Sequence, residues 1–103
     1  MRYLRVGCAR EFRSGEGRTV EVDGRPVAVF RIDGSYYAID DRCSHMGGPL
    51  GQGRVVGGCV VCPWHGARFE LGSGRVKAPP AGRDVACFPV KRDGDDVFVG
   101  VES

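Results

Sequence analysis

This chain carries two short motifs, Cys43-Ser44-His45-Met46-Gly47 and Cys62-Pro63-Trp64-His65-Gly66, and sixteen residues separate the first histidine from the second cysteine. Each motif places a histidine shortly after a cysteine and ends in glycine, and both histidines of the chain fall in this pattern. Thiolates and imidazoles are common ligands of transition metals. Because each motif mixes the two ligand types, the pattern favours a [2Fe–2S] cluster in which histidines replace two of the cysteines.

Two other interpretations of these residues remain open. One zinc ion could bind the same four side chains, although zinc fingers usually pair Cys with Cys and His with His, whereas each motif here is mixed. The segment Cys59-Val60-Val61-Cys62 also matches a Cys-x-x-Cys redox motif. The sequence does not predict the helix that would follow such a motif in a thioredoxin-like unit.

The composition indicates a single small domain. A chain of 103 residues is too short for two hydrophobic cores, and 17 glycines and six prolines indicate turns more than long helices. A net charge of +2 with mixed signs favours neither nucleic acid nor a membrane surface as partner. Residues 1–6 lack the apolar segment of a signal peptide, and no apolar run is long enough to span a bilayer. A cytoplasmic location is therefore expected.

Five cysteines cannot all pair as disulfides within one chain. If Cys43 and Cys62 bind metal, three remain: Cys8, Cys59 and Cys87. Small apolar side chains of this kind are usually buried. We expect these three cysteines to be structural and to lie in the core.

Three Asp-Gly pairs predict tight turns between strands, because the second residue of such a turn needs a positive φ that glycine adopts freely. The pairs are Asp23-Gly24, Asp33-Gly34 and Asp93-Gly94. The strands expected around them cover residues 17–22, 26–32, 35–40, 88–91 and 97–101. Residues 9–15 could form at most one helical turn. The two ends of the chain therefore predict an antiparallel meander.

The middle of the chain has a different composition. Six of the seventeen residues from 42 to 58 are glycine, and Pro49 interrupts any strand, so this segment is not expected to sustain a strand ladder. Residues 57–61 and 67–71 are expected to pair as strands around the second motif. The whole chain is then one domain, residues 1–103, with an inserted metal-binding subdomain at about residues 42–81 on a base formed by residues 1–41 and 82–103.

The two motifs, the glycine-rich spacer and the later Pro79-Pro80 pair together resemble a Rieske-type [2Fe–2S] ferredoxin over the whole chain. The resemblance implies an all-β Rieske fold, in which an antiparallel, β-sandwich-like base carries an inserted cluster-binding subdomain. It implies one cluster with four ligands, which are Cys43 and Cys62 on one iron and His45 and His65 on the other, nearer the solvent. Pro79 and Pro80 would form the loop that covers the cluster.

Four positions differ from the high-potential branch of the family. Those proteins join the two loops by a disulfide, whereas the matching residues here are Gly48 and Trp64, which suits a reducing compartment. Their Ser and Tyr hydroxyls contact cluster and ligand sulfurs, whereas the matching residues here are Ala67 and Phe69. Fewer donors to sulfur stabilise the reduced cluster less. A reduction potential in the lower part of the Rieske range of about −150 to +300 mV is expected.

The resemblance implies an electron carrier and not a catalyst. Both histidines are assigned to iron, a fully ligated cluster leaves no position for substrate, and the sequence has no nucleotide fingerprint. A flavoprotein reductase that oxidises NAD(P)H would supply single electrons, and a terminal oxygenase (an aromatic-ring dioxygenase or a monooxygenase) would receive them. Both contacts would be transient. The expected docking residues near the cluster are Met46, Trp64 and Pro80.

Two alternative functions remain. The chain also resembles the small Rieske-like subunit of NAD(P)H nitrite reductase, many members of which lack the cluster ligands. The second alternative is a regulatory module in which the cluster senses redox state. Intact Cys/His motifs argue against the first and are compatible with the second.

Overall fold

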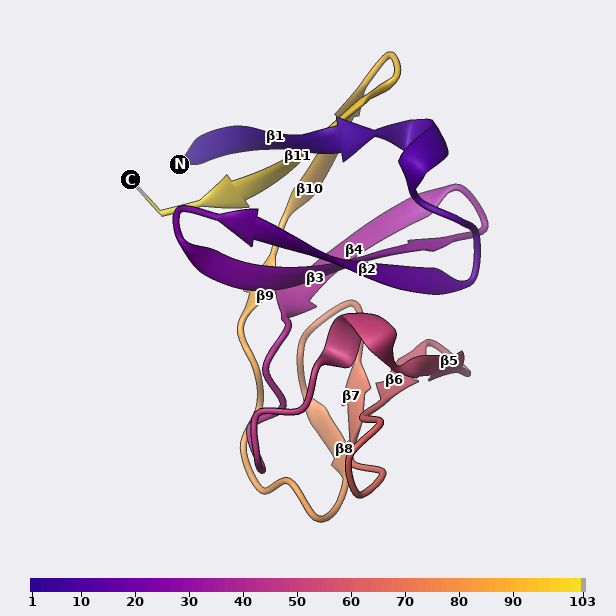
Figure 1. The fold of residues 1–103 in the computed structure, drawn as a ribbon, viewed down its shortest axis with the longest axis vertical. Coiled ribbons are helices and arrows are strands. Elements are labelled where there is room, and N and C mark those ends of the chain that lie inside the picture. Colours follow the sequence, from indigo (N-terminus) through magenta and orange to yellow (C-terminus); the bar gives the residue numbers. More distant parts are fainter. Residues whose placement is uncertain (103) are drawn as a thin grey trace.

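The computed structural model describes residues 1–102 and contains three antiparallel sheets stacked along the longest axis of the molecule (Figure 1). The first sheet has the strand order β1 (Arg2–Cys8), β11 (Asp96–Val101), β10 (Val90–Asp93). The middle sheet has the order β2 (Glu16–Val22), β3 (Arg25–Ile32), β4 (Ser35–Asp40), β9 (Cys87–Phe88). The third sheet has the order β5 (Arg54–Val56), β6 (Cys59–Val61), β7 (Arg68–Glu70), β8 (Val76–Ala78).

Helical structure within residues 1–102 is limited to two short 3-10 turns, η1 (Ala9–Glu11) and η2 (Leu50–Gln52). None of the helical segments in this range has the length and hydrophobicity that crossing a membrane requires. The predicted all-β fold is confirmed, and the single turn expected near residue 9 is η1.

Two of the three predicted Asp-Gly turns form as expected, at Asp23-Gly24 and Asp33-Gly34. In the third hairpin Asp93 is the last residue of β10 and pairs with Asp96, so the turn residues are Gly94 and Asp95 and the predicted turn was one residue too early. The three hairpins connect β2 to β3, β3 to β4 and β10 to β11, and each pair of strands is antiparallel. Asp23 and Asp33 have φ values of 52° and 50°, and the glycines that follow them have φ values of 76° and 85°. These are left-handed conformations at both central positions, which is the geometry that a tight two-residue hairpin requires. Local turn chemistry therefore determines most of the base.

Pro89 divides a segment that the sequence predicted as one strand. Residues 88–91 belong to two strands, because β9 pairs with β4 in the middle sheet and β10 pairs with β11 in the first sheet. Proline has no N–H to donate to a ladder, although its carbonyl accepts a hydrogen bond from the Gly100 N–H at 2.9 Å. The prediction of one continuous strand was wrong, and Pro89 is where the chain passes from one sheet to the next.

Strand β3 is buried on both faces and separates two hydrophobic cores. Val27 and Val29 face the first sheet, where they pack with residues such as Val97 and Val99. The alternate residues Ala28 and Phe30 face the third sheet. Successive side chains of a strand point to opposite faces, so a strand between two cores is apolar at every position. The middle sheet thus forms the floor on which the third sheet rests (Figure 1).

The third sheet lies between β4 and β9 in the sequence, although those two strands are neighbours in the middle sheet. We propose that residues 42–81 form an inserted subdomain and that the remaining residues form the base. The expected pairing around the second motif is observed between β6 and β7. The expectation of no ladder in residues 42–58 was wrong at β5, because Arg54–Val56 pairs with β6 through the Gly57-Gly58 turn.

A buried carboxylate joins the base to the inserted subdomain. Asp41 is 6% exposed, and its Oδ1 accepts hydrogen bonds from the Thr19 hydroxyl at 2.7 Å and from the Gly51 N–H at 2.8 Å. Its backbone carbonyl also accepts a hydrogen bond from the Leu50 N–H at 2.6 Å. Asp41 precedes Cys43 by two residues, so these bonds hold the start of the first motif against the middle sheet. No sequence motif marks Asp41 or Thr19 for this role.

Candidate metal centre

The first motif forms a compact loop closed by two backbone hydrogen bonds. The Cys43 N–H donates to the Gly48 carbonyl at 2.9 Å, and the Gly47 N–H donates to the Cys43 carbonyl at 2.8 Å. Gly47 has a φ of 78°, a left-handed conformation that glycine adopts at no steric cost. The loop therefore turns the chain back over Cys43.

The second motif closes in the same way. The Cys62 N–H donates to the Ala67 carbonyl at 2.7 Å, the Gly66 N–H donates to the Cys62 carbonyl at 3.3 Å, and the φ of Gly66 is 79°. In this loop the histidine is the fourth residue, whereas in the first loop it is the third. His65 itself has a φ of 71°, which is uncommon for histidine. The two loops are thus closed by the same pair of backbone hydrogen bonds and face one site, and they differ in the position of the histidine within the loop.

The cysteines and histidines of the two loops lie at different depths. Cys43 and Cys62 are 4% and 2% exposed, whereas His45 and His65 are both exposed. The two imidazole rings stand edge to face, with 5.4 Å between their centroids and an angle of 83° between their planes. The site therefore has a sulfur side within the protein and a nitrogen side toward solvent.

The surroundings of Cys62 shield its sulfur from water and favour the neutral thiol. Burial raises the pKa of the Cys62 thiol, and the neighbouring Cys43 thiol raises it further. The backbone N–H of Trp64 donates to Cys62 Sγ at 3.4 Å and lowers the pKa of this thiol, because the hydrogen bond favours the thiolate. A positive metal centre would deprotonate both thiols and replace this protonated state.

The donor set fits a [2Fe–2S] cluster with two sulfur and two nitrogen ligands. The buried pair, Cys43 and Cys62, could hold one iron, and the exposed pair, His45 and His65, could hold the other. Within residues 1–102, no group of three His, Cys, Asp or Glu side chains is gathered as the ligands of one ion would be. The four side chains form two pairs at two depths.

Gly48 and Trp64, which match the disulfide positions of the high-potential branch, lie close together. A Cβ atom built on Gly48 would lie 3.0 Å from Trp64 Cγ and 2.8 Å from Cys62 Sγ. The indole thus occupies the space that a side chain at position 48 would need. All five cysteines are free thiols, so no disulfide joins the loops.

Ala67 and Phe69 are fully buried and belong to the same hydrophobic core as Cys43 and Cys62. Neither side chain has a hydroxyl, so neither can donate a hydrogen bond to sulfur. The two positions that were expected to lack donors are therefore apolar and shielded from water.

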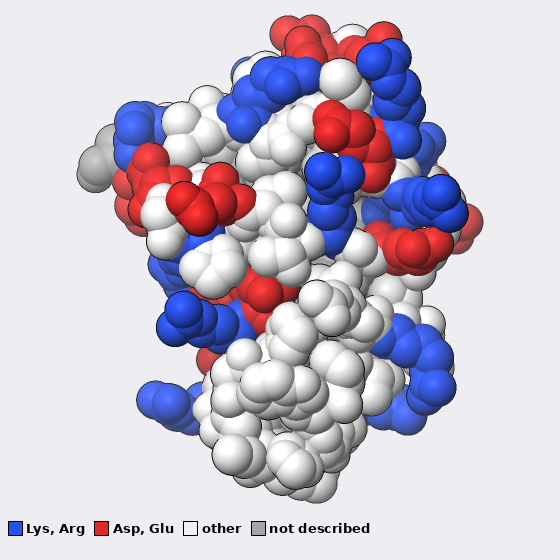
Figure 2. Space-filling view, viewed as in Figure 1, with Lys and Arg blue, Asp and Glu red and all other residues white. Residues whose placement is uncertain are grey.

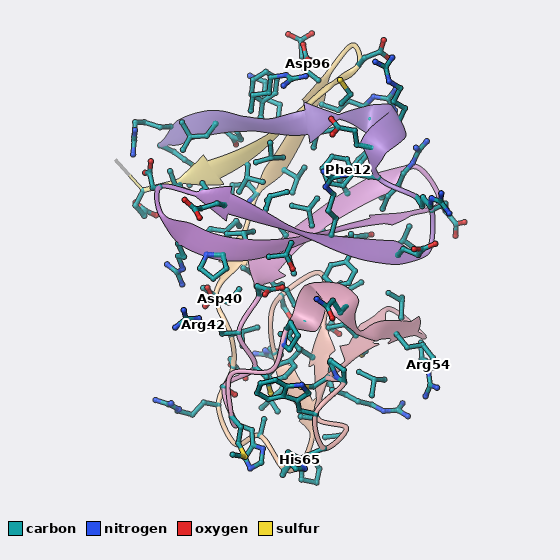
Figure 3. The ribbon with its side chains drawn as sticks, viewed as in Figure 1. Phe12, Asp40, Arg42, Arg54, His65 and Asp96 are labelled. Atoms are coloured by element: carbon teal, nitrogen blue, oxygen red, sulfur yellow. The ribbon has the colours of Figure 1, made fainter. Side chains whose placement is uncertain are left out.

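The expected docking residues all lie on the surface. Met46 and Trp64 are 60% and 49% exposed, and Pro80 is exposed as well. Figure 3 places His65 at the far end of the molecule from the first sheet. The segment that follows Pro79-Pro80 is tied to the first loop, because the Ser44 hydroxyl donates to the Arg83 carbonyl at 2.6 Å.

The three remaining cysteines are not buried as the sequence analysis expected. Cys87 is exposed, and Cys8 and Cys59 are partly exposed. Cys8 and Cys59 lie in β1 and β6, and Cys87 opens the two-residue strand β9 at the edge of the middle sheet. An edge strand is covered on one side only. The expectation of core positions was therefore wrong for Cys87 and only half right for the other two.

Comparison with known proteins identifies this arrangement. The family model described as "Rieske [2Fe-2S] domain" matches residues 2–89. The biphenyl dioxygenase ferredoxin subunit of Pseudomonas sp. (strain KKS102) is 33% identical over 100 residues, which cover 96% of this chain and 92% of that protein. The ferredoxin of carbazole 1,9a-dioxygenase from Nocardioides aromaticivorans IC177 superposes with a TM-score of 0.94 at 30% identity, covering 99% of this chain and 100% of that one.

Two further solved structures bear on partners and alternatives. A complex of reduced oxygenase and oxidised ferredoxin in carbazole 1,9a-dioxygenase contains a chain that is 31% identical, with a TM-score of 0.87 and coverage of 94% and 91%. A structure described as a nitrite reductase NADPH small-subunit protein has a TM-score of 0.82 at 22% identity and covers 98% and 100%. The second likeness shows the shared fold alone.

Proposed function

The chain belongs to the Rieske [2Fe-2S] domain family, and from that premise we propose that its two Cys/His loops together hold one [2Fe–2S] cluster. The proposed ligands are Cys43, His45, Cys62 and His65. The observation that supports this assignment is the equal closure of the two loops, which buries both thiols and leaves both imidazoles exposed.

When bound, the cluster supplies reversible one-electron chemistry. The buried cysteines keep the sulfur side of the site away from water, and the backbone N–H of Trp64 donates a hydrogen bond to Cys62 Sγ. The exposed imidazoles of His45 and His65 provide a short path to solvent and carry ring N–H groups that can exchange a proton as the electron moves. Because imidazole is neutral where thiolate is negative, the two histidines make it easier to add an electron than four cysteines would.

The protein is an electron carrier and not the catalytic component, since the relatives are ferredoxin subunits of dioxygenase systems. Its electrons go to a terminal oxygenase of the ring-hydroxylating type, and the known complex of a related ferredoxin with its oxygenase supports this partner. The proposed electron donor is a flavoprotein reductase that oxidises NAD(P)H. The proposed location of the protein is the cytoplasm.

The proposed docking surface is the exposed end of the inserted subdomain around Met46, Trp64 and Pro80. Electron-transfer encounters are small and weak, so a few exposed apolar side chains around the imidazoles are sufficient. Trp64→Glu should slow transfer to the oxygenase and leave the cluster intact. Loss of the cluster in this variant would assign Trp64 to the support of the site instead of to docking.

The experiment that tests the function combines EPR with turnover. The purified protein is treated in parallel with ascorbate and with dithionite, and the reduced protein is then mixed with a ring-hydroxylating oxygenase and its aromatic substrate. A rhombic Rieske signal with dithionite alone, followed by product formation, would support the proposal. Absence of the signal together with bound zinc would reject the cluster. A normal signal without product formation would reject the oxygenase and favour a regulatory role.

A further inference from the structure

The charges of the chain are segregated between its two parts. Residues 42–81 contain five Lys or Arg and one Glu, a net charge of +4, whereas the base contains ten Lys or Arg and twelve Asp or Glu, a net charge of −2. The overall charge of +2 conceals this difference. A cluster with two thiolates and two neutral imidazoles adds no net charge when it is oxidised and one negative charge when it is reduced, so most of the excess of +4 would remain.

Three of the five basic residues of the inserted subdomain border the two uncharged segments that contain its cluster loops. Residues 43–53 and 55–67 contain no charged side chain, and arginines stand at their ends: Arg42, Arg54 and Arg68. Figure 2 shows this distribution on one face of the molecule. The end of the inserted subdomain, at the bottom of the view, has no charged side chain (white), and Lys or Arg side chains (blue) stand on both sides of it. In Figure 3, Arg42 and Arg54 lie on opposite flanks of this lobe and His65 lies at its end.

Strand register places two of these arginines on one surface. Arg54 pairs with Val61, and Val61 pairs with Arg68, so the three side chains point to the same side of the third sheet. In the next row, Val60 and Phe69 point to the opposite side and are fully buried. Val61 and Arg68 also flank the second cluster loop directly. Arg68 therefore stands next to the second cluster loop, and Arg54 stands two strands away on the same side of the sheet; these two arginines are called the rim.

These arginines are not neutralised within the protein. In the base, several arginines have a carboxylate within reach, as in Arg5–Asp96 at 2.8 Å and Arg25–Asp40 at 2.7 Å. Across residues 1–102, no ion pair involves Arg42, Arg54 or Arg68, and all three are exposed. The acidic residue of the subdomain, Glu70, already pairs with Lys77 at 3.8 Å.

We infer that the redox partner docks through an acidic face, an apolar contact area ringed by carboxylates that meets the uncharged end and its surrounding arginines. The inference rests on the proposed electron-carrier function and specifies the partner's surface. Complementary charge steers an encounter and fixes its orientation more than it adds affinity. The negative charge of the base strengthens the orientation of the encounter, because the acidic face of the partner repels the base and attracts the inserted subdomain.

The first test measures the field at the cluster without a protein partner. The protein is reduced with dithionite, desalted, and oxidised in a stopped-flow instrument by ferricyanide or by hexaamminecobalt(III), each of which takes one electron from one reduced cluster. We expect the ferricyanide rate constant to fall and the cobalt rate constant to rise, each by about tenfold, between about 20 mM and 500 mM salt. Equal salt dependence for the two oxidants would overturn the inference.

Matched charge reversals separate the rim from the rest of the protein. The double variant Arg54→Glu with Arg68→Glu should abolish or invert the preference for the anionic oxidant. The control is Arg10→Glu with Arg13→Glu, which makes the same change in net charge at two exposed base residues that take part in no ion pair within residues 1–102. The Rieske EPR signal verifies that each variant keeps its cluster. An equal effect of the two pairs would show that net charge alone matters.

The second test uses a terminal oxygenase that accepts electrons from the wild-type protein. The rim variant should raise the KM for the ferredoxin by about tenfold at low salt with kcat unchanged, and the difference should disappear at high salt. Turnover that is indifferent to Arg54→Glu and Arg68→Glu would overturn the acidic partner. Failure of the wild-type protein to support any oxygenase, with its cluster intact, would instead overturn the proposed function.

Discussion

Ala67 and Phe69 make the surroundings of the candidate site apolar at two fully buried positions. Introducing hydroxyls there with Ala67→Ser and Phe69→Tyr should raise the reduction potential, because a donor to sulfur stabilises the reduced state more than the oxidised state. If the difference is about 1.4 kcal/mol, the shift for one electron is about 60 mV. Spectroelectrochemical titration of the wild type and the two single variants measures it.

A control for this pair uses a position outside the site. Val20 on β2 packs against the other core, and Val20→Thr adds a hydroxyl there. We expect its midpoint potential to stay at the wild-type value. A wild-type potential already in the upper half of the Rieske range would contradict the argument, since it would mean that other donors compensate for the missing hydroxyls.

Gly48 illustrates what residue types alone do not reveal. The Cys/His motifs indicate the candidate ligands and, through the resemblance, the absence of a disulfide between positions 48 and 64. The contact that replaces the disulfide, with the Trp64 ring over the space of an absent side chain, follows from packing between the two loops. The left-handed φ of His65 is likewise a consequence of three-dimensional closure, because the sequence shows only that one loop has an extra residue before its histidine.

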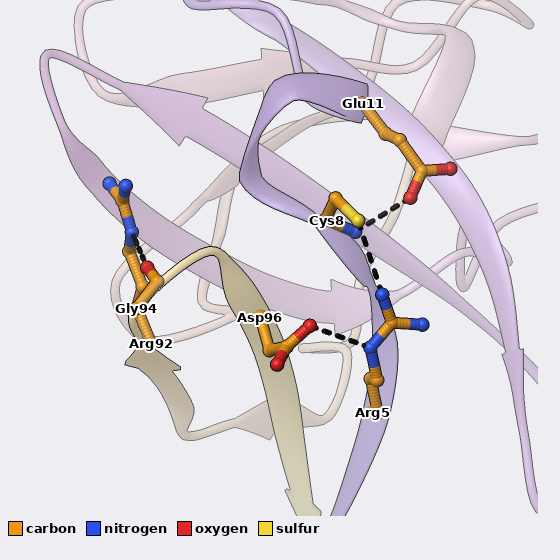
Figure 4. A network of polar contacts seen from close by, with 6 residues as sticks. All are labelled: Arg5, Cys8, Glu11, Arg92, Gly94 and Asp96. Atoms are coloured by element: carbon orange, nitrogen blue, oxygen red, sulfur yellow. Dashed lines mark hydrogen bonds and ion pairs between the residues drawn. The ribbon is translucent and has the colours of Figure 1, made fainter.

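Strand β1 ends in a small polar network around η1, shown in Figure 4. Glu11 Oε1 accepts a hydrogen bond from the Cys8 N–H at 2.6 Å, and Arg5 Nε donates to Asp96 Oδ1 at 2.8 Å on the neighbouring β11. The bond from the Cys8 N–H lowers the pKa of Glu11, and Arg18 lowers it further. Ionised Glu11 therefore stabilises the turn that leads from the first sheet to the middle sheet.

This network predicts a pH dependence of stability. Because the pKa of Glu11 is lower in the folded protein than in the unfolded chain, its contribution is present above the unfolded value and is lost as the pH falls through the folded value. Glu11→Gln should lower Tm at pH 7, and the difference from wild type should shrink below about pH 5. Thermal unfolding between pH 3 and pH 7 checks this, with Glu21→Gln on β2 as a control. A difference that stays constant with pH would contradict the role of ionised Glu11.

The bonds of Asp41 predict a larger loss of stability. Asp41→Ala leaves the Gly51 N–H and the Thr19 hydroxyl without their acceptor, and an unsatisfied buried donor costs about 1–3 kcal/mol. For a domain of this size the change should lower Tm by about 10 °C. The visible absorption of the cluster should also bleach at a lower temperature than in the wild type, because the start of the first loop is released.

Glu21→Ala is the matched control for Asp41→Ala. It removes a carboxylate from an exposed position of β2, where its side chain forms no hydrogen bond or ion pair with other residues in the range 1–102. Its Tm should differ little from the wild-type value. If the two variants were equally stable, the hydrogen bonds of Asp41 would contribute nothing net to the fold.

At the scale of elements, the sequence predicts what depends on neighbouring residues. Asp-Gly pairs determine two hairpins, and Gly94 provides the positive φ of the third, because each turn needs a left-handed conformation. The two wrong predictions, one continuous strand through Pro89 and no strand ladder at β5, have another origin. Sheet membership on either side of Pro89 depends on strands far away in the chain, and Arg54–Val56 becomes a strand because β6 offers it a partner.

At the scale of the whole molecule, the overall fold came from the resemblance and not from local pattern. The pairing of β1 with β11 joins Arg2 to Val101, and no local signal marks so distant a contact. Likewise, residues 27–30 form a continuous apolar run, which indicates burial but does not say that two separate cores share the strand. These features arise from the packing of three sheets, which a sequence alone does not display.

The position of the site within the molecule predicts tolerance of fusion. The molecule measures 38 × 29 × 18 Å, and the candidate site lies at the opposite end of its long axis from the first sheet, to which β1 belongs (Figures 1 and 3). A folded protein joined ahead of Met1 should leave both the Rieske EPR signal and the rate of oxidation by ferricyanide unchanged. A slower oxidation with an intact signal would mean that the attached protein reaches the cluster end.

Because Arg2 and Val101 are paired neighbours, they lie side by side in the first sheet, toward the opposite end of the molecule from His65 (Figures 1 and 3). A domain joined next to either residue therefore stands clear of the imidazoles. An electrode coated with the protein through a terminal tag would hold every molecule with its imidazoles toward the solution. The molecule would then exchange electrons with dissolved acceptors and remain insulated from the metal beneath it.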